Sequence, residues 1–73
     1  MYKPKNELVS NTVSQLRHGR SLTQDELAAL VHVTRQTIIA IEKGNYVPSV
    51  LLALKLAKVF KKPVEEVFRY EAR

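Results

Sequence analysis

Cysteine is absent from the 73-residue sequence, and glycine occurs only at positions 19 and 44. Without cysteine the chain can form neither disulfide bonds nor thiolate metal sites, so we expect a fold that depends on packing and needs no metal or cofactor. The two isolated glycines exclude a glycine-rich loop that would bind a phosphate. A chain of this length buries only about 60% of its unfolded surface, so we expect residues 1–73 to form a single small domain without an enclosed substrate cleft.

Long apolar runs are also missing. No stretch approaches the roughly 20 residues that cross a bilayer. Residues 1–7 are polar and lack the apolar core of a signal peptide. We therefore expect a cytoplasmic protein that does not contact a membrane, and the lack of cysteine suits a reducing compartment.

The sequence offers no group of residues that could carry out catalysis. His18 and His32 are isolated, with no acidic or thiol partner at the spacing of metal ligands. The acidic pairs at residues 25–26 and 65–66 begin predicted helices, where the helix dipole explains them. We therefore predict that the protein is not an enzyme.

Basic residues outnumber acidic ones, with twelve Lys and Arg against seven Asp and Glu, which gives a net charge of +5 and a pI near 9.8. A basic surplus favours a polyanionic partner such as nucleic acid. Many small domains, however, are basic only for solubility, so a specific motif is needed before a partner can be inferred.

Hydrophobic periodicity and capping residues predict four helices and a short fifth. The first covers about residues 11–18 and ends at Gly19, and the second follows Thr23, which forms a capping box with Glu26. The third is capped by Thr34 and runs to about residue 43, where residues 44–45 end it. The fourth is capped by Ser49, and the last short turn of helix spans about residues 63–67.

The apolar residues of each predicted helix recur on one face, which we expect to be buried. These residues are Val9, Val13 and Leu16 for the first helix, Leu27, Leu30 and Val31 for the second, Ile38 and Ile41 for the third, and Val50, Leu52, Ala53, Leu56, Ala57 and Phe60 for the fourth. Residues 7–10 could extend the first helix or form a short strand, and residues 68–70 alternate as a strand would. The fold class that we predict is all-α, with short terminal strands left open as an addition.

The second and third predicted helices are separated only by a short turn, as in a helix-turn-helix. In that motif the second helix lies in the major groove of DNA and contacts bases with its first residues. Arg35 can donate two hydrogen bonds to guanine, Gln36 can pair with adenine, and Thr34 and Thr37 can contact a phosphate or a thymine methyl group. The alternative is that these residues form an ordinary solvated surface.

Several stretches of sequence together resemble the Cro and phage-repressor type of helix-turn-helix, also described as lambda repressor-like or XRE-type. Residues 22–28 (LTQDELA) are followed by residues 33–38 (VTRQTI) and 41–44 (IEKG). The similarity continues through Pro48 and Ser49 into residues 52–57 and covers about residues 16–68. The combined pattern is far more specific than any one of these stretches.

The resemblance implies roles for individual residues. Gln24 matches a glutamine that binds a DNA phosphate and supports the reading helix. The base-facing positions correspond to Thr34, Arg35, Gln36, Thr37 and Ala40. The positions that contact phosphates after the reading helix correspond to Lys43, Asn45 and Tyr46. Arg17 and Glu42 match a pair that forms a structural salt bridge.

Two residues depart from the family pattern, which usually has polar residues at their positions. Ile39 could contact a thymine methyl group or a partner. Leu51 could belong to a dimer patch together with Val67, Phe68 and Tyr70, or it could be a lone surface leucine.

The resemblance implies a bacterial, sequence-specific regulator of transcription that binds double-stranded DNA. Compact repressors of this family, the cytolysin-repressor type among them, pair short end strands and dimerise without an effector domain. We therefore expect a homodimeric repressor of a palindromic operator. The alternative is an antitoxin-type module that neutralises a small protein partner and regulates its own gene, and copurification with a second small protein would favour it.

Overall fold

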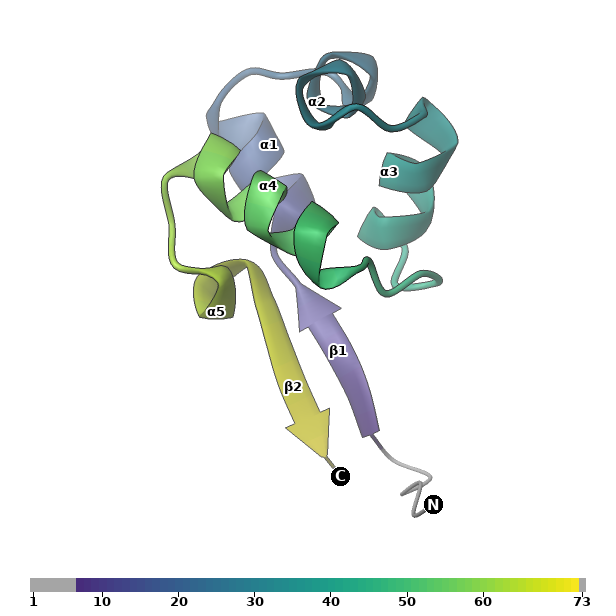
Figure 1. Cartoon of the computed structure of the whole chain (residues 1–73), viewed down its shortest axis with the longest axis vertical. Helices are drawn as coiled ribbons and strands as arrows, with labels where there is room; N and C mark the ends of the chain where they lie inside the picture. Colours follow the sequence, from purple (N-terminus) through teal and green to yellow (C-terminus); the bar gives the residue numbers. More distant parts are fainter. Residues whose placement is uncertain (1–6, 73) are drawn as a thin grey trace.

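A computed structural model describes residues 7–72, which form five helices and two strands (Figure 1). In chain order the elements are β1 (Glu7–Asn11), α1 (Val13–Gly19), α2 (Gln24–Val31), α3 (Arg35–Glu42), α4 (Val50–Phe60), α5 (Val64–Val67) and β2 (Phe68–Ala72). The helices gather into one body, from which the ribbon of β1 and β2 projects. The predicted helical domain is therefore correct, but the fold is not purely all-α.

The two strands pair in antiparallel register, from Glu7 opposite Ala72 to Asn11 opposite Phe68. The strand alternative for residues 7–10 is thus confirmed. Helix α1 begins at Val13 and not at residue 11, because Asn11 ends the strand and its side-chain oxygen accepts a hydrogen bond from the Val13 backbone N–H at 3.1 Å. The backbone N–H of Thr12 donates to the Val67 carbonyl at 2.9 Å, which fastens the base of the ribbon to the helical body.

Each of the five helices contributes to one hydrophobic core. Its largest fully buried side chains are Leu27, Ile38, Ile41, Leu56, Val13, Val31 and Val67. Most of the predicted inward faces are therefore correct. The burial predicted for two residues is wrong. Leu30 is 53% exposed because it lies beside the inward face of α2. Val50 is 76% exposed because it lies on the outer face of α4.

Val67 also requires a correction. It was a candidate for a dimer patch, but the short helix α5 turns its side chain into the core, where it is fully buried. It has no surface to offer a partner.

Helices α1 to α4 all end in the same way. A residue with positive φ follows the last turn of each, namely Ser21, His32, Gly44 and Lys61. The N–H of the next residue then bonds the carbonyl five positions earlier, for example Lys62 to Ala57 at 3.1 Å. This is the Schellman arrangement, which satisfies carbonyls that the helix leaves unpaired. Gly44 was predicted to end α3, whereas Ser21, and not Gly19, adopts the left-handed conformation after α1.

An ion pair fastens α1 to α3. Arg17 Nε lies 2.7 Å from Glu42 Oε2, and Arg17 Nη2 lies 3.2 Å from Glu42 Oε1. A third donor, Arg17 Nη1, bonds the carbonyl of Leu22 at 2.8 Å. The two side chains are only 10% and 9% exposed. Because such a charge loses its hydration, removal of either partner would leave the other without compensation.

The surroundings of this pair shift the protonation of both groups. Burial alone would raise the pKa of Glu42, but hydrogen bonds from Arg17 and Gln24, together with the positive charge of Arg17, hold that pKa below its usual value. The hydrogen bond to Glu42 raises the pKa of Arg17 against the opposing effect of burial. Both residues are therefore held in their charged forms.

The left-handed residue after α4 provides a test of the helix endings. Lys61 adopts φ 56° and ψ 43°, which costs a residue with a Cβ atom about 1–2 kcal/mol. Glycine has no such cost but loses more backbone entropy on folding, so Lys61→Gly should raise the free energy of unfolding by about 0.5–1 kcal/mol. Urea denaturation would measure the change. Lys62→Gly removes the same charge at a neighbouring position without positive φ, and an equal gain there would contradict this explanation.

The ion pair predicts a specific acid sensitivity. Because folding lowers the pKa of Glu42, the pair stabilises the fold above the unfolded-state pKa, and this contribution is lost as the pH falls through the folded-state value. Glu42→Gln should lower the free energy of unfolding near pH 7 by about 3 kcal/mol. Below about pH 5, the free energy of unfolding of the variant should also change less steeply with pH than that of the unchanged protein.

Urea denaturation at a series of pH values, with a stabilising osmolyte where needed, would measure both effects. Glu65→Gln removes an exposed carboxylate at the start of α5 and serves as the matched control. Equal slopes for the unchanged protein and Glu42→Gln would show that Glu42 does not supply this acid sensitivity.

Candidate nucleic-acid interface

Local hydrogen bonds define the start of each helix of the motif. The hydroxyl of Thr23 accepts from the Glu26 backbone N–H at 3.0 Å, and the Glu26 carboxylate accepts from the Thr23 N–H at 2.8 Å, which confirms the predicted capping box. The Thr34 hydroxyl accepts from the Thr37 N–H at 3.4 Å. His32 adopts φ 62° between the two helices, so α3 begins only four residues after α2 ends.

Helix α3 has an apolar face and a polar face. Ile38 and Ile41 are fully buried in the core. The residues at the opposite side of its first turn, Arg35 and Gln36, are exposed, and Thr37 is half-buried next to them. The start of α3 therefore presents hydrogen-bonding side chains to solvent while the other face anchors the helix.

Gln24 connects the two helices of the motif. It is the first residue of α2, and its side-chain Nε2 donates to Glu42 Oε1, at the last residue of α3, with a distance of 3.1 Å. Glu42 in turn holds Arg17 of α1. Three helices thus meet at one carboxylate, which fixes the direction of α3 relative to α2.

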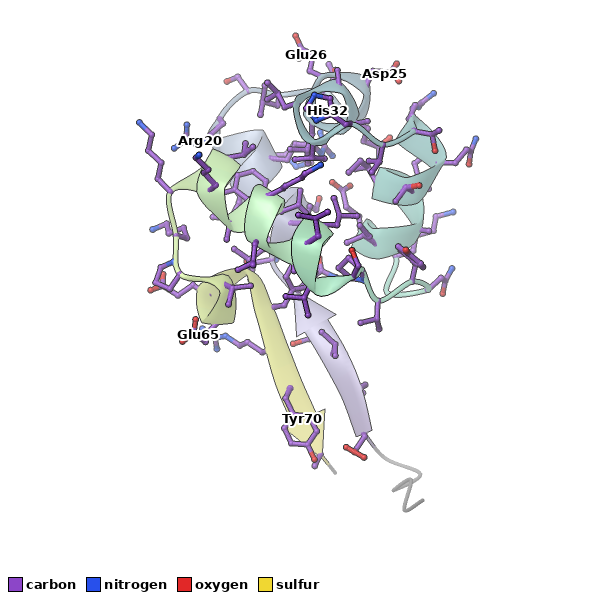
Figure 2. The ribbon with its side chains drawn as sticks, viewed as in Figure 1. Arg20, Asp25, Glu26, His32, Glu65 and Tyr70 are labelled. Atoms are coloured by element: carbon purple, nitrogen blue, oxygen red, sulfur yellow. The ribbon has the colours of Figure 1, made fainter. Side chains whose placement is uncertain are left out.

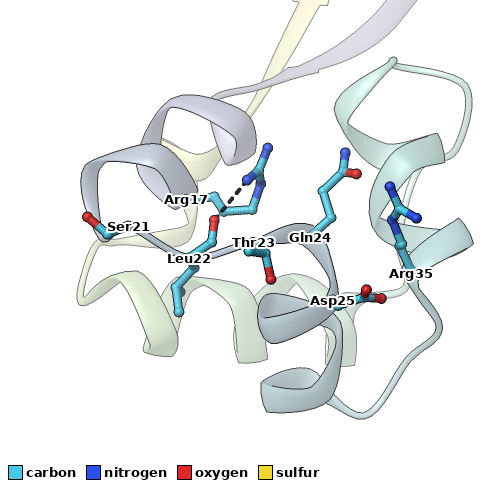
Figure 3. A pocket seen from close by; sticks show the side chains of 7 residues that line it. All are labelled: Arg17, Ser21, Leu22, Thr23, Gln24, Asp25 and Arg35. Carbon is cyan, nitrogen blue, oxygen red and sulfur yellow. Dashed lines mark hydrogen bonds between the residues drawn. The ribbon is translucent and has the colours of Figure 1, made fainter.

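An open cleft lies between the turn before α2 and the start of α3 (Figure 3). Seven residues line it: Arg17, Ser21, Leu22, Thr23, Gln24, Asp25 and Arg35. The side chains of Gln24 and Arg35 both extend into the space between the two helices. The cleft thereby combines an amide and a guanidinium, groups that can donate to a phosphate or a base.

A second hollow lies at the other side of α3. Its lining consists of Gln36, Thr37, Ala40, Asn45 and Tyr46, so the predicted positions after α3 lie beside the predicted reading positions. Lys43 is exposed at the end of α3 and belongs to neither hollow, and Thr34 is exposed at its start. Ile39, the departure from the family pattern, is half-buried.

The predicted dimer residues do not form one group. Leu51 is 65% exposed on α4, and Tyr70 is 67% exposed on the projecting ribbon, where Figure 2 labels it. Phe68 is half-buried against the core. Sequence reasoning also missed Ser21 and Asp25 as residues of the cleft. Asp25 was assigned only to the helix dipole, although its position one residue after Gln24 could have indicated its place.

Neither histidine forms part of a larger polar cluster. His18 Nδ1 lies 2.7 Å from the carbonyl of Ser14, within its own helix, and His32 lies at the turn after α2 (Figure 2). Within residues 7–72, no three His, Cys, Asp or Glu side chains are grouped so that they could hold a metal ion. In the same part of the chain, every helix is too short to cross a membrane.

Comparisons with known proteins agree with this geometry. The family described as helix-turn-helix matches residues 13–67. The HTH-type transcriptional regulator YgzD of Bacillus subtilis is 51% identical over 63 residues, which are 86% of this chain and 96% of that protein. The cryptic phage CTXphi transcriptional repressor RstR of Vibrio cholerae is 35% identical over 60 residues, 82% of this chain and 54% of RstR.

A solved structure supports the same assignment. The restriction-modification controller protein C.AhdI from Aeromonas hydrophila matches with a TM-score of 0.68 and 30% sequence identity, covering 74% of this chain and 82% of C.AhdI. The matched residues 13–67 include both helices of the motif, the turn between them and the Arg17–Glu42 pair. The chain therefore belongs to the helix-turn-helix family of DNA-binding transcriptional regulators, of the Cro and phage-repressor type.

Proposed function

We propose that this protein is a transcriptional repressor that binds a palindromic operator as a homodimer, with the start of α3 in the major groove. The observation that carries the proposal is the exposed polar end of α3, at Arg35 and Gln36, which two hollows flank. A helix that enters the groove must present long donors and acceptors at its first turn while its other face is anchored in the core. Ile38 and Ile41 provide that anchor.

Base recognition would come from the first turn of α3. Arg35 can donate two hydrogen bonds to the O6 and N7 atoms of guanine, and Gln36 can pair with the N6 and N7 atoms of adenine. Thr37 and Ala40 lie further along the same side and are small enough for close approach to a thymine methyl group. Sequence preference would therefore depend mainly on two long side chains.

Contacts with the DNA backbone would flank the reading residues. Gln24 in the cleft would bind a phosphate on one side of α3. On the other side, Lys43, Asn45 and Tyr46 would contact phosphates after α3 ends. Such contacts supply affinity and register without reading sequence, which is the division of roles seen in DNA-binding proteins generally.

One relative and the symmetry of DNA sites support the proposal of repression by a homodimer. RstR is a phage transcriptional repressor, and 82% of this chain aligns with it. A two-fold symmetric dimer would place two copies of α3 on successive major grooves, which matches a palindromic site. The antitoxin alternative has no support, because the relatives compared above carry the names of transcriptional regulators and a controller protein.

Replacement of Arg35 tests the reading role. Arg35→Ala should reduce discrimination at one base position by about 1–3 kcal/mol, because the two donors to guanine are lost. The melting temperature should change little, since the side chain is exposed. Binding sites selected from random duplexes, followed by affinities for single-base variants, would measure the effect. Equal affinity of the unchanged protein for every duplex would contradict the proposed function itself.

Replacement of Lys43 should have a different result. Lys43→Ala should weaken binding to all duplexes by a similar factor, because a phosphate contact carries no sequence information. The slope of log affinity against log salt concentration should decrease in magnitude by about 1. Titrations at several salt concentrations would measure this slope for the unchanged protein and both variants. A base-specific loss for Lys43→Ala would show that this residue enters the groove.

A further inference from the structure

An apolar stripe covers the outer side of the first half of α4 and includes Val47, two residues before the helix cap Ser49. It comprises Val47, Val50, Leu51 and Leu54, whose exposed fractions are 60%, 76%, 65% and 52%. Val50 and Leu54 are four residues apart and Leu51 and Leu54 are three apart, which places these three on one side of α4. Val47 lies in the loop before the helix cap. Four large apolar side chains at such exposure within residues 47–54 differ from the scattered single leucines of ordinary surfaces.

The opposite side of the same helix is also apolar. Leu52, Leu56 and Phe60 face the core and are at most 7% exposed. A helix that lies at a protein surface usually has one polar face, and a helix that is apolar all round is usually buried. The first two turns of α4 therefore have the character of a buried helix although one side is open to solvent.

Charge is distributed unevenly along the outer side of α4. The stripe itself contains no charged residue, whereas Lys58, Lys61 and Lys62 are exposed at the other end of the helix. An acidic partner would be attracted to this lysine end, away from the stripe. The neutral stripe instead suits a partner surface that is itself apolar.

We propose that the stripe is the surface through which a second copy of this chain docks. Two-fold symmetry brings the same patch of each copy together, so an apolar stripe is complementary to itself. If the two α4 helices cross antiparallel at their first halves, the lysine ends point away from each other, which reduces repulsion between two chains of net charge +5. This inference rests on the proposed homodimeric function and assigns the dimer surface.

The stripe alone is smaller than a standard interface, to which each partner contributes about 800 Å². Its four large side chains, each more than half exposed, suit a weak dimer contact. The aliphatic part of Lys55, which lines a groove together with Leu51, can add to this contact.

The position of the stripe also suits DNA recognition. It begins at Val47, directly after Asn45 and Tyr46 in the loop between α3 and α4. Docking there would direct the last residues of the two α3 helices toward the two-fold axis and leave their first residues, at Arg35 and Gln36, facing outward. The dimer contact and the reading surface would then occupy opposite ends of α3.

Sedimentation equilibrium provides the first test. Leu54→Glu should weaken the dimer by on the order of 100-fold or more, because it places an unpaired charge in the apolar contact. Leu30→Glu on α2 is the matched control, since Leu30 is 53% exposed and Leu54 is 52% exposed. The control should change the dimer dissociation constant by less than about threefold. Circular dichroism of both variants checks that the helices remain folded.

Three outcomes would overturn the inference. The unchanged protein could be monomeric at concentrations that saturate its operator. Leu54→Glu could remain as dimeric as the unchanged protein. Alternatively, Leu30→Glu could separate the copies as strongly as Leu54→Glu does. Any of these results would show that the dimer contact lies elsewhere or does not exist.

Cysteine crosslinking tests the surface without a disruptive charge. Because the chain contains no cysteine, a single introduced thiol can react only with the same thiol of another copy. Val50→Cys, Leu51→Cys and Leu54→Cys are each treated with a short bis-maleimide, with Leu30→Cys as the control. We expect covalent dimers from at least one stripe variant and none from the control. Crosslinking only through residue 30, or through none of the four positions, would overturn the inference.

Binding to DNA separates this inference from the proposed function. If the dimer forms through the stripe, Leu54→Glu should lose affinity for the full palindrome and retain the affinity of the unchanged protein for a half-site. Full retention of palindrome affinity would refute the stripe while the proposed repressor role stands. No sequence preference in the unchanged protein would refute the repressor role, whereas sedimentation and crosslinking would still decide whether the stripe joins two copies.

Discussion

The carboxylate of Glu42 is the point on which the arrangement of the first three helices depends. It accepts hydrogen bonds from Arg17 of α1 and Gln24 of α2 and is itself the last residue of α3. Buried ion pairs contribute little net stability compared with apolar residues of similar volume, but their geometry is directional. Here the third donor of Arg17 is also used, by the carbonyl of Leu22, and within residues 7–72 no buried side-chain polar atom lacks a partner. The pair therefore fixes the orientation of α3 without leaving any of its buried polar atoms unpaired.

Local chemistry explains which parts of this fold could be predicted. Thr23, Thr34 and Ser49 each cap a helix through a hydroxyl that accepts from the backbone N–H three residues later, and this preference is readable from a few neighbouring residues. The left-handed conformations of Ser21 and Lys61 were not predictable in this way, because neither residue type favours positive φ. They adopt it because the chain must turn there to keep both adjoining elements against the core.

The functional residues differ in how far the sequence could predict them. The exposure of Arg35 and Gln36 was predictable, because it follows from the helical period of α3 that Ile38 and Ile41 set. Features that depend on tertiary packing were not predictable. Helix α5 has only four residues, too few to show a period, so the burial of Val67 depended on the direction in which the chain returns to the body. The hydrogen bond from Gln24 to Glu42 joins residues 18 positions apart and was not predicted, because the family resemblance implied only that Gln24 supports the reading helix.

The misprediction of Val50 and the apolar stripe have a common physical origin. Residues 50–54 are all apolar, so the first turns of α4 show no alternation between a core face and a solvent face. A helical period can be read only where polar residues interrupt the apolar ones, and here that interruption begins at Lys55 and Lys58. The same continuous run that hides which side is buried also leaves a second apolar side in solvent. Its cost to a monomer would be removed if a second copy covers it, so the residue that sequence reasoning assigned to the core would be buried after all, in the core of an interface.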